Sequence, residues 1–131
     1  MFVDSHCHLD KLDYQDLHTS VEDVVNKAKA ANVDQLLSVG VTLDSFENML
    51  EMISPFDNVK ASCGVHPLDV ESDFCLDRMR EYASNPKVVA IGETGLDYHR
   101  NYSPQKEQKV SFENHVELAI ELNMPLFLHV R

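Results

Sequence analysis

The sequence predicts an α/β fold built on a parallel sheet, and three patterns support this prediction. Apolar runs alternate with segments of helical spacing in the order β-α-β-α-β-α-β-α-β, which favours parallel strands joined by right-handed crossovers. The runs 36–39 and 88–91 are almost continuously apolar, as parallel strands buried on both faces should be. Residues able to carry chemistry gather where the expected strands end, which is where parallel α/β folds place their sites.

The spacing of the apolar residues predicts five strands and four helices. We expect strands at Phe2–Ser5, Gln35–Val41, Val59–Val65, Val88–Gly92 and Pro125–Val130. We expect helices at Ser20–Ala31, Leu43–Ile53, Asp73–Ala83 and Pro104–Leu122. Thr19 or Ser20 can cap the first helix, and Ser103 followed by Pro104 indicates a cap with proline at the first helical position.

These elements are too few for a complete barrel. A (β/α)8 TIM barrel needs roughly 200 to 250 residues or more, and this chain has 131. The fifth expected strand ends beside Arg131 with no helix after it. We therefore expect residues 1–131 to form the N-terminal portion of a single TIM-barrel domain, with an open five-stranded sheet as the alternative. An open sheet edge must be paired or hidden, so self-association through that edge is one expected consequence.

The chain is strongly acidic, which excludes a basic surface for nucleic acid. It has 22 acidic and 11 basic residues, giving a formal charge of −11. A basic footprint for duplex DNA or for an anionic membrane is therefore absent. If the substrate is a polyanion, bound divalent cations are the candidates for attracting it, since they can be the largest local charges in a site.

The cysteines and the start of the chain indicate a cytoplasmic protein. Cys7, Cys63 and Cys75 are odd in number and lack C-x-x-C spacing, so they indicate neither a disulfide framework nor a structural zinc site. No apolar stretch approaches the ~20 residues that a membrane span requires. The first expected strand begins at Phe2, and we see no signal peptide before it.

The triplet His6-Cys7-His8 is the most informative short motif. Successive side chains of a strand point to opposite faces, so His6 and His8 share one face and Cys7 points away. Two imidazoles about 7 Å apart at the end of a rigid strand can hold one ion such as Zn, Mn or Fe. A lone His-x-His is weak evidence, and the alternative is a pair of hydrogen-bonded core histidines.

Further candidate ligands follow other expected strands. His66 closes the third, Glu93 follows the fourth between two glycines, and His129 and Arg131 close the fifth. The carboxyl ends of parallel strands lie on the same side of the sheet, so we expect these side chains to lie near the His-x-His motif. Their collection there by chance is improbable.

Four segments closely resemble the TatD family of metal-dependent deoxyribonucleases: Phe2–Asp10, Gly64–Pro67, Gly92–Tyr98 and His129–Arg131. That family belongs to the amidohydrolase-like group of metal-bearing TIM barrels. The resemblance covers the whole chain, and the helix and strand expected from Gln108 onward also look like those of the family. The run Gly-Glu-Thr-Gly-Leu-Asp-Tyr together with the N-terminal His-x-His is highly specific.

The resemblance implies two divalent metal ions (Mg, Mn or Zn) at the mouth of the barrel. His6 and His8 match ligands of the first ion, Glu93 matches the carboxylate that bridges both, and His129 matches a ligand of the second. A carboxylate has two oxygens and can span two cations about 3.5 to 4 Å apart, which would activate a water and stabilise charge on a phosphodiester. Two further family ligands, a histidine and an aspartate, come from later strands, beyond Arg131. The aspartate is the natural general base.

Three residues are candidates for the substrate side of the site, each with an alternative. His66 contacts a substrate phosphate or caps its loop. Asp97 orients a ligand or caps the following turn. Arg131 pairs with a phosphate through two guanidinium nitrogens or is simply solvated.

Other ionisable residues carry weaker expectations. Asp4 should share the face of the His-x-His imidazoles and could accept a hydrogen bond from one of them. His18, His99 and His115 have no partner that the sequence suggests, so we expect them at the surface.

The sequence thus predicts a TatD-like deoxyribonuclease that cleaves single-stranded DNA or a DNA end with a metal-activated water, catalysis centring on Glu93. One alternative is an esterase, lactonase or phosphotriesterase of the amidohydrolase type on the same metal site. The other is a non-catalytic partial barrel that binds metal or pairs its open edge with another copy.

Overall fold

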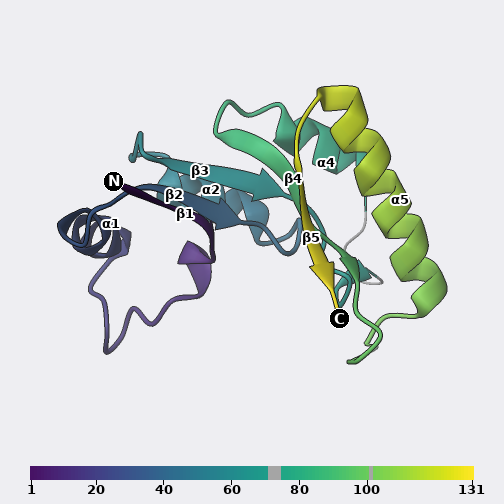
Figure 1. Cartoon of the computed structure of the whole chain (residues 1–131), viewed down its shortest axis with the longest axis horizontal. Helices are drawn as coiled ribbons and strands as arrows, with labels where there is room; N and C mark the ends of the chain where they lie inside the picture. The colour runs from purple at the N-terminus through teal and green to yellow at the C-terminus, as the bar shows by residue number, and fades with distance from the viewer. Residues whose placement is uncertain (71–74, 101) are drawn as a thin grey trace.

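The computed structural model describes residues 1–70, 75–100 and 102–131, which form a curled sheet of five parallel strands packed against helices (Figure 1). The strands are β1 (Phe2–Cys7), β2 (Val33–Val39), β3 (Val59–Cys63), β4 (Val88–Leu96) and β5 (Leu126–Val130). The helices are α1 (Val21–Ala30), α2 (Phe46–Ile53), α4 (Leu76–Ala83) and α5 (Gln105–Leu122), with a short 3-10 helix η1 (Leu9–Lys11).

Each strand pairs with the next strand along the chain, in the order β1-β2-β3-β4-β5. A doubly wound open sheet reverses its strand order at one point, and these five described strands show no reversal. Figure 1 shows the strands turning progressively from β1 to β5, with α1 near β1 and α5 beside β4 and β5. The arrangement is half of a (β/α)8 barrel, so the prediction of a partial barrel is confirmed.

A single hydrophobic core joins the outer face of the sheet to the helices. Fully buried strand residues meet fully buried helix residues in it: Val59, Ala61, Cys63 and Ile91 from the sheet, and Phe46, Met49, Ile53, Met79 and Leu118 from the helices. This core fixes one face of every inner strand, so the opposite, concave face is left for the side chains that form the site.

The local sequence explains where the helices start and stop. Ser20 caps α1 as predicted, because its Oγ accepts a hydrogen bond from the N–H of Asp23 at 3.1 Å. Pro104 is the N-cap of α5 with an extended ψ of 143°, so the helix begins at Gln105 and not at the proline as we expected. The helix ends at Leu122 because Asn123 adopts the left-handed conformation with φ of 53°.

Two element boundaries differ from the prediction in ways that matter for the site. β4 runs on through Leu96, four residues beyond its expected end at Gly92, so Glu93 lies inside the strand and does not follow it. β3 ends at Cys63, which leaves His66 in the loop beyond the strand. Of the expected helix Asp73–Ala83, the structure shows Leu76–Ala83, and residues 73 and 74 lie outside the described part.

β1 and β5 are the edge strands of the described sheet, and both expose apolar side chains. Phe2 and Val3 are 64% and 59% exposed, and Leu128 and Val130 are 56% and 78% exposed.

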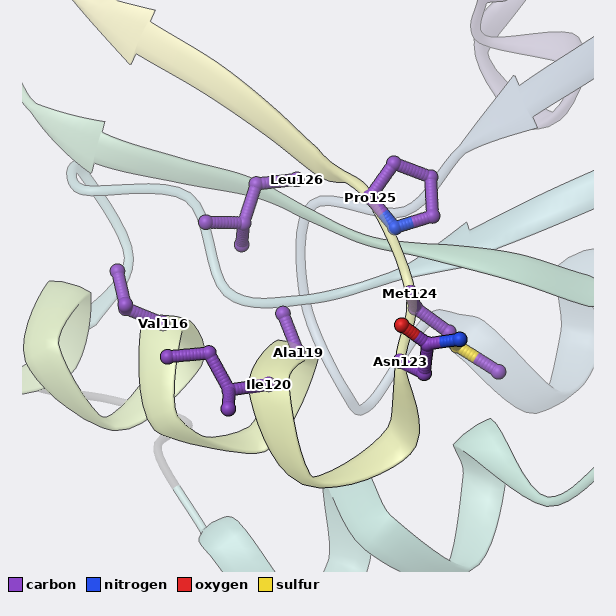
Figure 2. Close-up of a pocket in the computed structure, with 7 residues that line it drawn as sticks. All are labelled: Val116, Ala119, Ile120, Asn123, Met124, Pro125 and Leu126. Carbon is purple, nitrogen blue, oxygen red and sulfur yellow. The ribbon is translucent and has the colours of Figure 1, made fainter.

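Beside β5 lies a hollow of about 440 Å³. Figure 2 shows that α5 side chains form one wall and the segment leading into β5 the other: Val116, Ala119, Ile120, Asn123, Met124, Pro125 and Leu126. None of the described helices has the length and hydropathy of a membrane span.

Candidate metal centre

Glu93 lies at the centre of a group of imidazoles contributed by other strands. Its carboxylate Oε1 is 3.7 Å from Nε2 of His6 and 3.4 Å from Nδ1 of His129, and its Oε2 is 4.0 Å from Nε2 of His8. The residue is only 8% exposed. A nearly buried carboxylate with two imidazoles from different strands near Oε1 and a third imidazole near Oε2 can contact two metal ions at once.

A bulge in β4 turns the Glu93 side chain to the concave face. Ile91 pairs with Leu126 and Thr94 pairs with Leu128, so three steps along β4 face two steps along β5. Without the extra residue, strict alternation would place Glu93 on the same face as the core residue Ile91. Gly92 has φ of 135° at this point, a conformation that glycine adopts readily, and its peptide bond to Glu93 is cis.

A similar irregularity in β1 sets the faces of the His-x-His motif. Asp4 pairs with the core residue Leu36 and Cys7 pairs with Ser38, again three steps against two. Asp4 and Cys7 therefore both face α1, where they line the same hollow, and His6 and His8 point to the opposite face. The expectation that Asp4 shares their face is wrong, because strict alternation along β1 does not allow for the extra residue.

The backbone selects the tautomer of His8. Its Nδ1 lies 3.0 Å from the backbone O of Val39, which can only accept, so Nδ1 carries the proton and donates it. Nε2 is consequently the nitrogen that remains for a metal ion, and it faces Oε2 of Glu93 at 4.0 Å. His6 packs edge-on against His8 and Phe127, with ring centroids 5.3 and 5.6 Å away.

His129 is oriented by the buried carboxylate of Asp97. Its Nε2 lies 2.9 Å from Oδ2 of Asp97, whose Oδ1 accepts a hydrogen bond from the N–H of Arg100 at 2.9 Å. The hydrogen bond from Arg100, followed by that from His129, lowers the pKa of Asp97 below its usual value, so the group is a carboxylate near neutral pH. Both roles that the sequence suggested for Asp97, orienting a ligand and capping a turn, are geometrically present. Its side chain is fully buried, and both of its oxygens have hydrogen-bond partners.

His66 joins this group from the loop after β3. Its Nδ1 accepts a hydrogen bond from the N–H of Leu68 at 3.2 Å, and its ring lies 4.3 Å from that of His129. Burial lowers the pKa of His66, and the opposing effect of Glu93 is smaller, so the ring favours its neutral form. The loop contact is the capping geometry that we weighed as the alternative to a phosphate contact.

The donor atoms fit divalent metal ions in two overlapping clusters. His6, His8 and Glu93 form the first cluster, and His66, Glu93 and His129 form the second, each with its ligand atoms within 4.8 Å of one another. Neutral imidazole nitrogens with one carboxylate suit Zn, Mn and Fe. Residues His6, His8, Glu93 and His129 are those that the family resemblance marks as ligands, and His66 is an addition that the geometry supplies.

Among the described interactions, Arg131 makes hydrogen bonds through its backbone and none through its side chain. Its N–H donates to the O of Leu96, and its own O accepts hydrogen bonds from the N–H groups of Tyr98 and His99 at 2.7 and 3.3 Å. The exposed guanidinium is free to meet a substrate, and the backbone contacts tie the loop after β4 to the end of β5.

The sequence reasoning missed two fully buried polar residues of α5. His115, which we expected at the surface, is 0% exposed, and so is Gln108. Their spacing could have revealed them, because Gln108, Ser111 and His115 recur at intervals of three and four residues on one helix face. We expected His99 at the surface, and the structure exposes it.

Comparison with known proteins gives a consistent family match. A family model described as TatD related DNase matches residues 3–131. The uncharacterized metal-dependent hydrolase YcfH of Escherichia coli K12 is 44% identical over 129 residues, covering 98% of this chain and 49% of that protein. The 3'-5' ssDNA/RNA exonuclease TatD of Cronobacter turicensis is 38% identical over 112 residues, covering 84% of this chain and 43% of that protein.

Solved structures show the same fold. The crystal structure of YjjV, a TatD homologue from Escherichia coli K12, matches with a TM-score of 0.86 and 25% identity over 99% of this chain and 51% of that one. A TatD family hydrolase from Entamoeba histolytica matches with a TM-score of 0.80 and 26% identity, covering 99% and 50%. The chain thus spans about half the length of the relatives that it matches.

Proposed function

The chain belongs to the TatD related DNase family, and from this membership we propose that it is the N-terminal portion of a metal-dependent hydrolase that cleaves phosphodiester bonds in DNA. The observation that carries the proposal is the Glu93 carboxylate between imidazoles of two clusters. This shared carboxylate supports a two-metal arrangement, with Mg, Mn or Zn as candidates.

Each residue of the centre has a distinct proposed task. His6 and His8 would hold one ion, His129 with His66 beside it would face the other, and Glu93 would contact both. When bound, the two ions would activate a water and neutralise charge on a phosphodiester.

A nucleic-acid substrate is supported by a relative and by charge. The Cronobacter relative is named as an exonuclease of single-stranded DNA and RNA. This chain has a charge of −11, so ions in the centre would supply the local positive charge that a polyanion needs. The exposed guanidinium of Arg131 is proposed as an additional phosphate contact.

The experiment is hydrolysis of end-labelled single-stranded DNA by the chain with Mg²⁺ or Mn²⁺. Because two further family ligands come from later strands, cleavage by this chain would mean that His6, His8, Glu93 and His129 suffice or that a second copy supplies the rest. Glu93→Ala should abolish that cleavage, and Glu113→Ala, at an exposed position of α5, should leave it unchanged. Small esters and a phosphotriester in parallel reactions test the amidohydrolase-type alternative. Hydrolysis of the esters without hydrolysis of DNA would replace the proposed substrate class, and hydrolysis of neither would contradict the proposal for this chain.

The edge strands support a second proposal, that the chain associates with another copy. Both β1 and β5 expose apolar side chains at the described edges. Two copies related by a two-fold axis along the barrel could place β5 of one beside β1 of the other with all strands parallel. We also keep the cytoplasm as the proposed location, on the ground that the cysteines have no paired spacing.

A further inference from the structure

α5 buries three polar side chains on the face that it turns toward the sheet. Gln108 and His115 are 0% exposed and Ser111 is 2% exposed, and their spacing places them on one side of the helix. Burying polar groups costs free energy unless they are hydrogen-bonded. Their partners therefore show what this buried polar face of α5 holds in place.

Gln108 holds the backbone around Asp97. Its Oε1 accepts a hydrogen bond from the N–H of Asp97 at 2.8 Å. Its Nε2 donates to the backbone O atoms of Asp97 at 3.2 Å and Ser103 at 2.7 Å, which closes the loop between β4 and α5. Because the Asp97 carboxylate in turn holds His129, Gln108 fixes the residue that orients this imidazole.

His115 holds the loop that carries His66. Its Nε2 accepts a hydrogen bond from the N–H of Val65 at 2.9 Å, and its Nδ1–H donates to the backbone O of Ser111 at 2.6 Å. One nitrogen accepts and the other donates, so the ring is neutral. Val65 directly precedes His66, and a fixed N–H at Val65 restricts where the next side chain can point.

We propose that the buried polar face of α5 positions the second cluster, formed by His66, Glu93 and His129. Gln108 acts through Asp97 on His129, and His115 acts through Val65 on His66. Both are positioning residues that touch neither metal nor substrate. One helix thereby fixes the positions of two loops, the one after β3 and the one between β4 and α5. The inference rests on the proposed function only in naming metal ions as the ligand.

The first test needs no metal and reads the imidazole signals of His66 and His129 in ¹H–¹⁵N spectra of the metal-free chain. Gln108→Met should shift or broaden the signal of His129, and His115→Leu should do the same for His66. His115→Gln should restore the His66 signal, since its amide can accept from Val65 and donate to Ser111. If Gln108→Met fails to fold, Gln108→Glu replaces it, because it keeps the acceptor and loses both donated bonds.

Leu118→Ala is the matched control, since Leu118 is a buried apolar residue of the same helix. It should lower stability without changing the two imidazole signals. Unchanged signals in the Gln108 and His115 variants, or equal changes in the Leu118 control, would overturn the inference. If the unaltered chain does not hydrolyse DNA, the proposed function is contradicted. The spectra would still test whether Gln108 and His115 position the two imidazoles.

The second readout is Mn²⁺ affinity in chains that also carry His6→Ala and His8→Ala, so that the second cluster alone remains. Gln108→Met and His115→Leu should each weaken binding by about 10-fold, as loss of outer hydrogen-bond partners commonly does at metal sites. His115→Gln and Leu118→Ala should bind within about 2-fold of their parent. Equal affinity in all of these chains would contradict a positioning role toward metal.

Discussion

Oδ2 of Asp97 lies 2.9 Å from Nε2 of His129, and this contact determines which imidazole nitrogen faces Glu93. A carboxylate can only accept, so Nε2 carries a proton, and Nδ1, 3.4 Å from Oε1 of Glu93, is the nitrogen that remains for a metal ion. The other oxygen of Asp97 is used by the N–H of Arg100. The buried carboxylate therefore selects the ligand atom of the second cluster without belonging to it.

Asp97→Asn should weaken metal binding at the second cluster. Asparagine has a single side-chain acceptor, so it cannot serve both Arg100 and His129, and its amide group favours the wrong tautomer of the imidazole. We expect Mn²⁺ affinity to fall by about 10-fold in a titration followed by electron paramagnetic resonance. Asp77→Asn, at a side chain 94% exposed on α4, is the control and should bind like the unaltered chain. Equal affinity in the two variants would argue against tautomer selection.

Gly95→Ala should destabilise the pairing of β4 with β5. Gly95 has φ of 146°, and a Cβ there would collide with the backbone O of His129. We expect a loss of about 2 to 4 kcal/mol in the free energy of unfolding measured with urea, and a weaker second cluster. Asn123→Gly, at a φ of 53° that suits glycine, should change stability by less than about 0.5 kcal/mol. Similar stability of the two variants would show that the strand can shift to admit a side chain.

His115 should make the chain less stable in mild acid. Burial lowers the pKa of His115 to about 4 from a value near 6.5, so the unfolded chain binds a proton more readily than the folded one. The stabilising contribution of the neutral His115 is fully present above pH 6.5 and is lost as the pH falls toward 4. Between pH 7 and 5 this residue alone should remove about 2 kcal/mol from the free energy of unfolding.

The measurement is urea unfolding at both pH values for the unaltered chain and for His115→Gln. The glutamine variant has no group that titrates in this range at the buried position, so its loss of stability should be smaller by about 2 kcal/mol. The same loss in both chains would assign the acid sensitivity to other histidines.

The order of strands and helices along the chain could be predicted because it depends on local periodicity. The proposed ligand roles of Glu93 and His129 came instead from the family resemblance. Alternation along β1 placed His6 and His8 on one face, and the apolar runs located the strands that bring Glu93 and His129 together. Helix ends with strong local signals, such as the Ser20 cap, were predicted correctly for the same reason.

Features that depend on tertiary contacts could not be predicted in this way. The extra residues in β1 and β4 appear only when the neighbouring strand is present, and they decide the faces of Asp4 and Glu93. The spacing of Gln108, Ser111 and His115 marks a shared face of α5, but which loops cover that face depends on contacts with distant parts of the chain. Burial of such residues follows from the long-range partner and not from the residue itself.

Self-association through the sheet edges gives a last prediction. If β5 of one copy pairs with β1 of another, the mass in solution should be twice 14.9 kDa by light scattering. Val130→Lys places a charge on the exposed end of β5, and charges on edge strands oppose pairing, so this variant should be monomeric. Val110→Lys, on an exposed position of α5, is the matched control and should remain a dimer. A monomeric unaltered chain would remove the proposal, and a dimer that survives Val130→Lys would place the interface elsewhere.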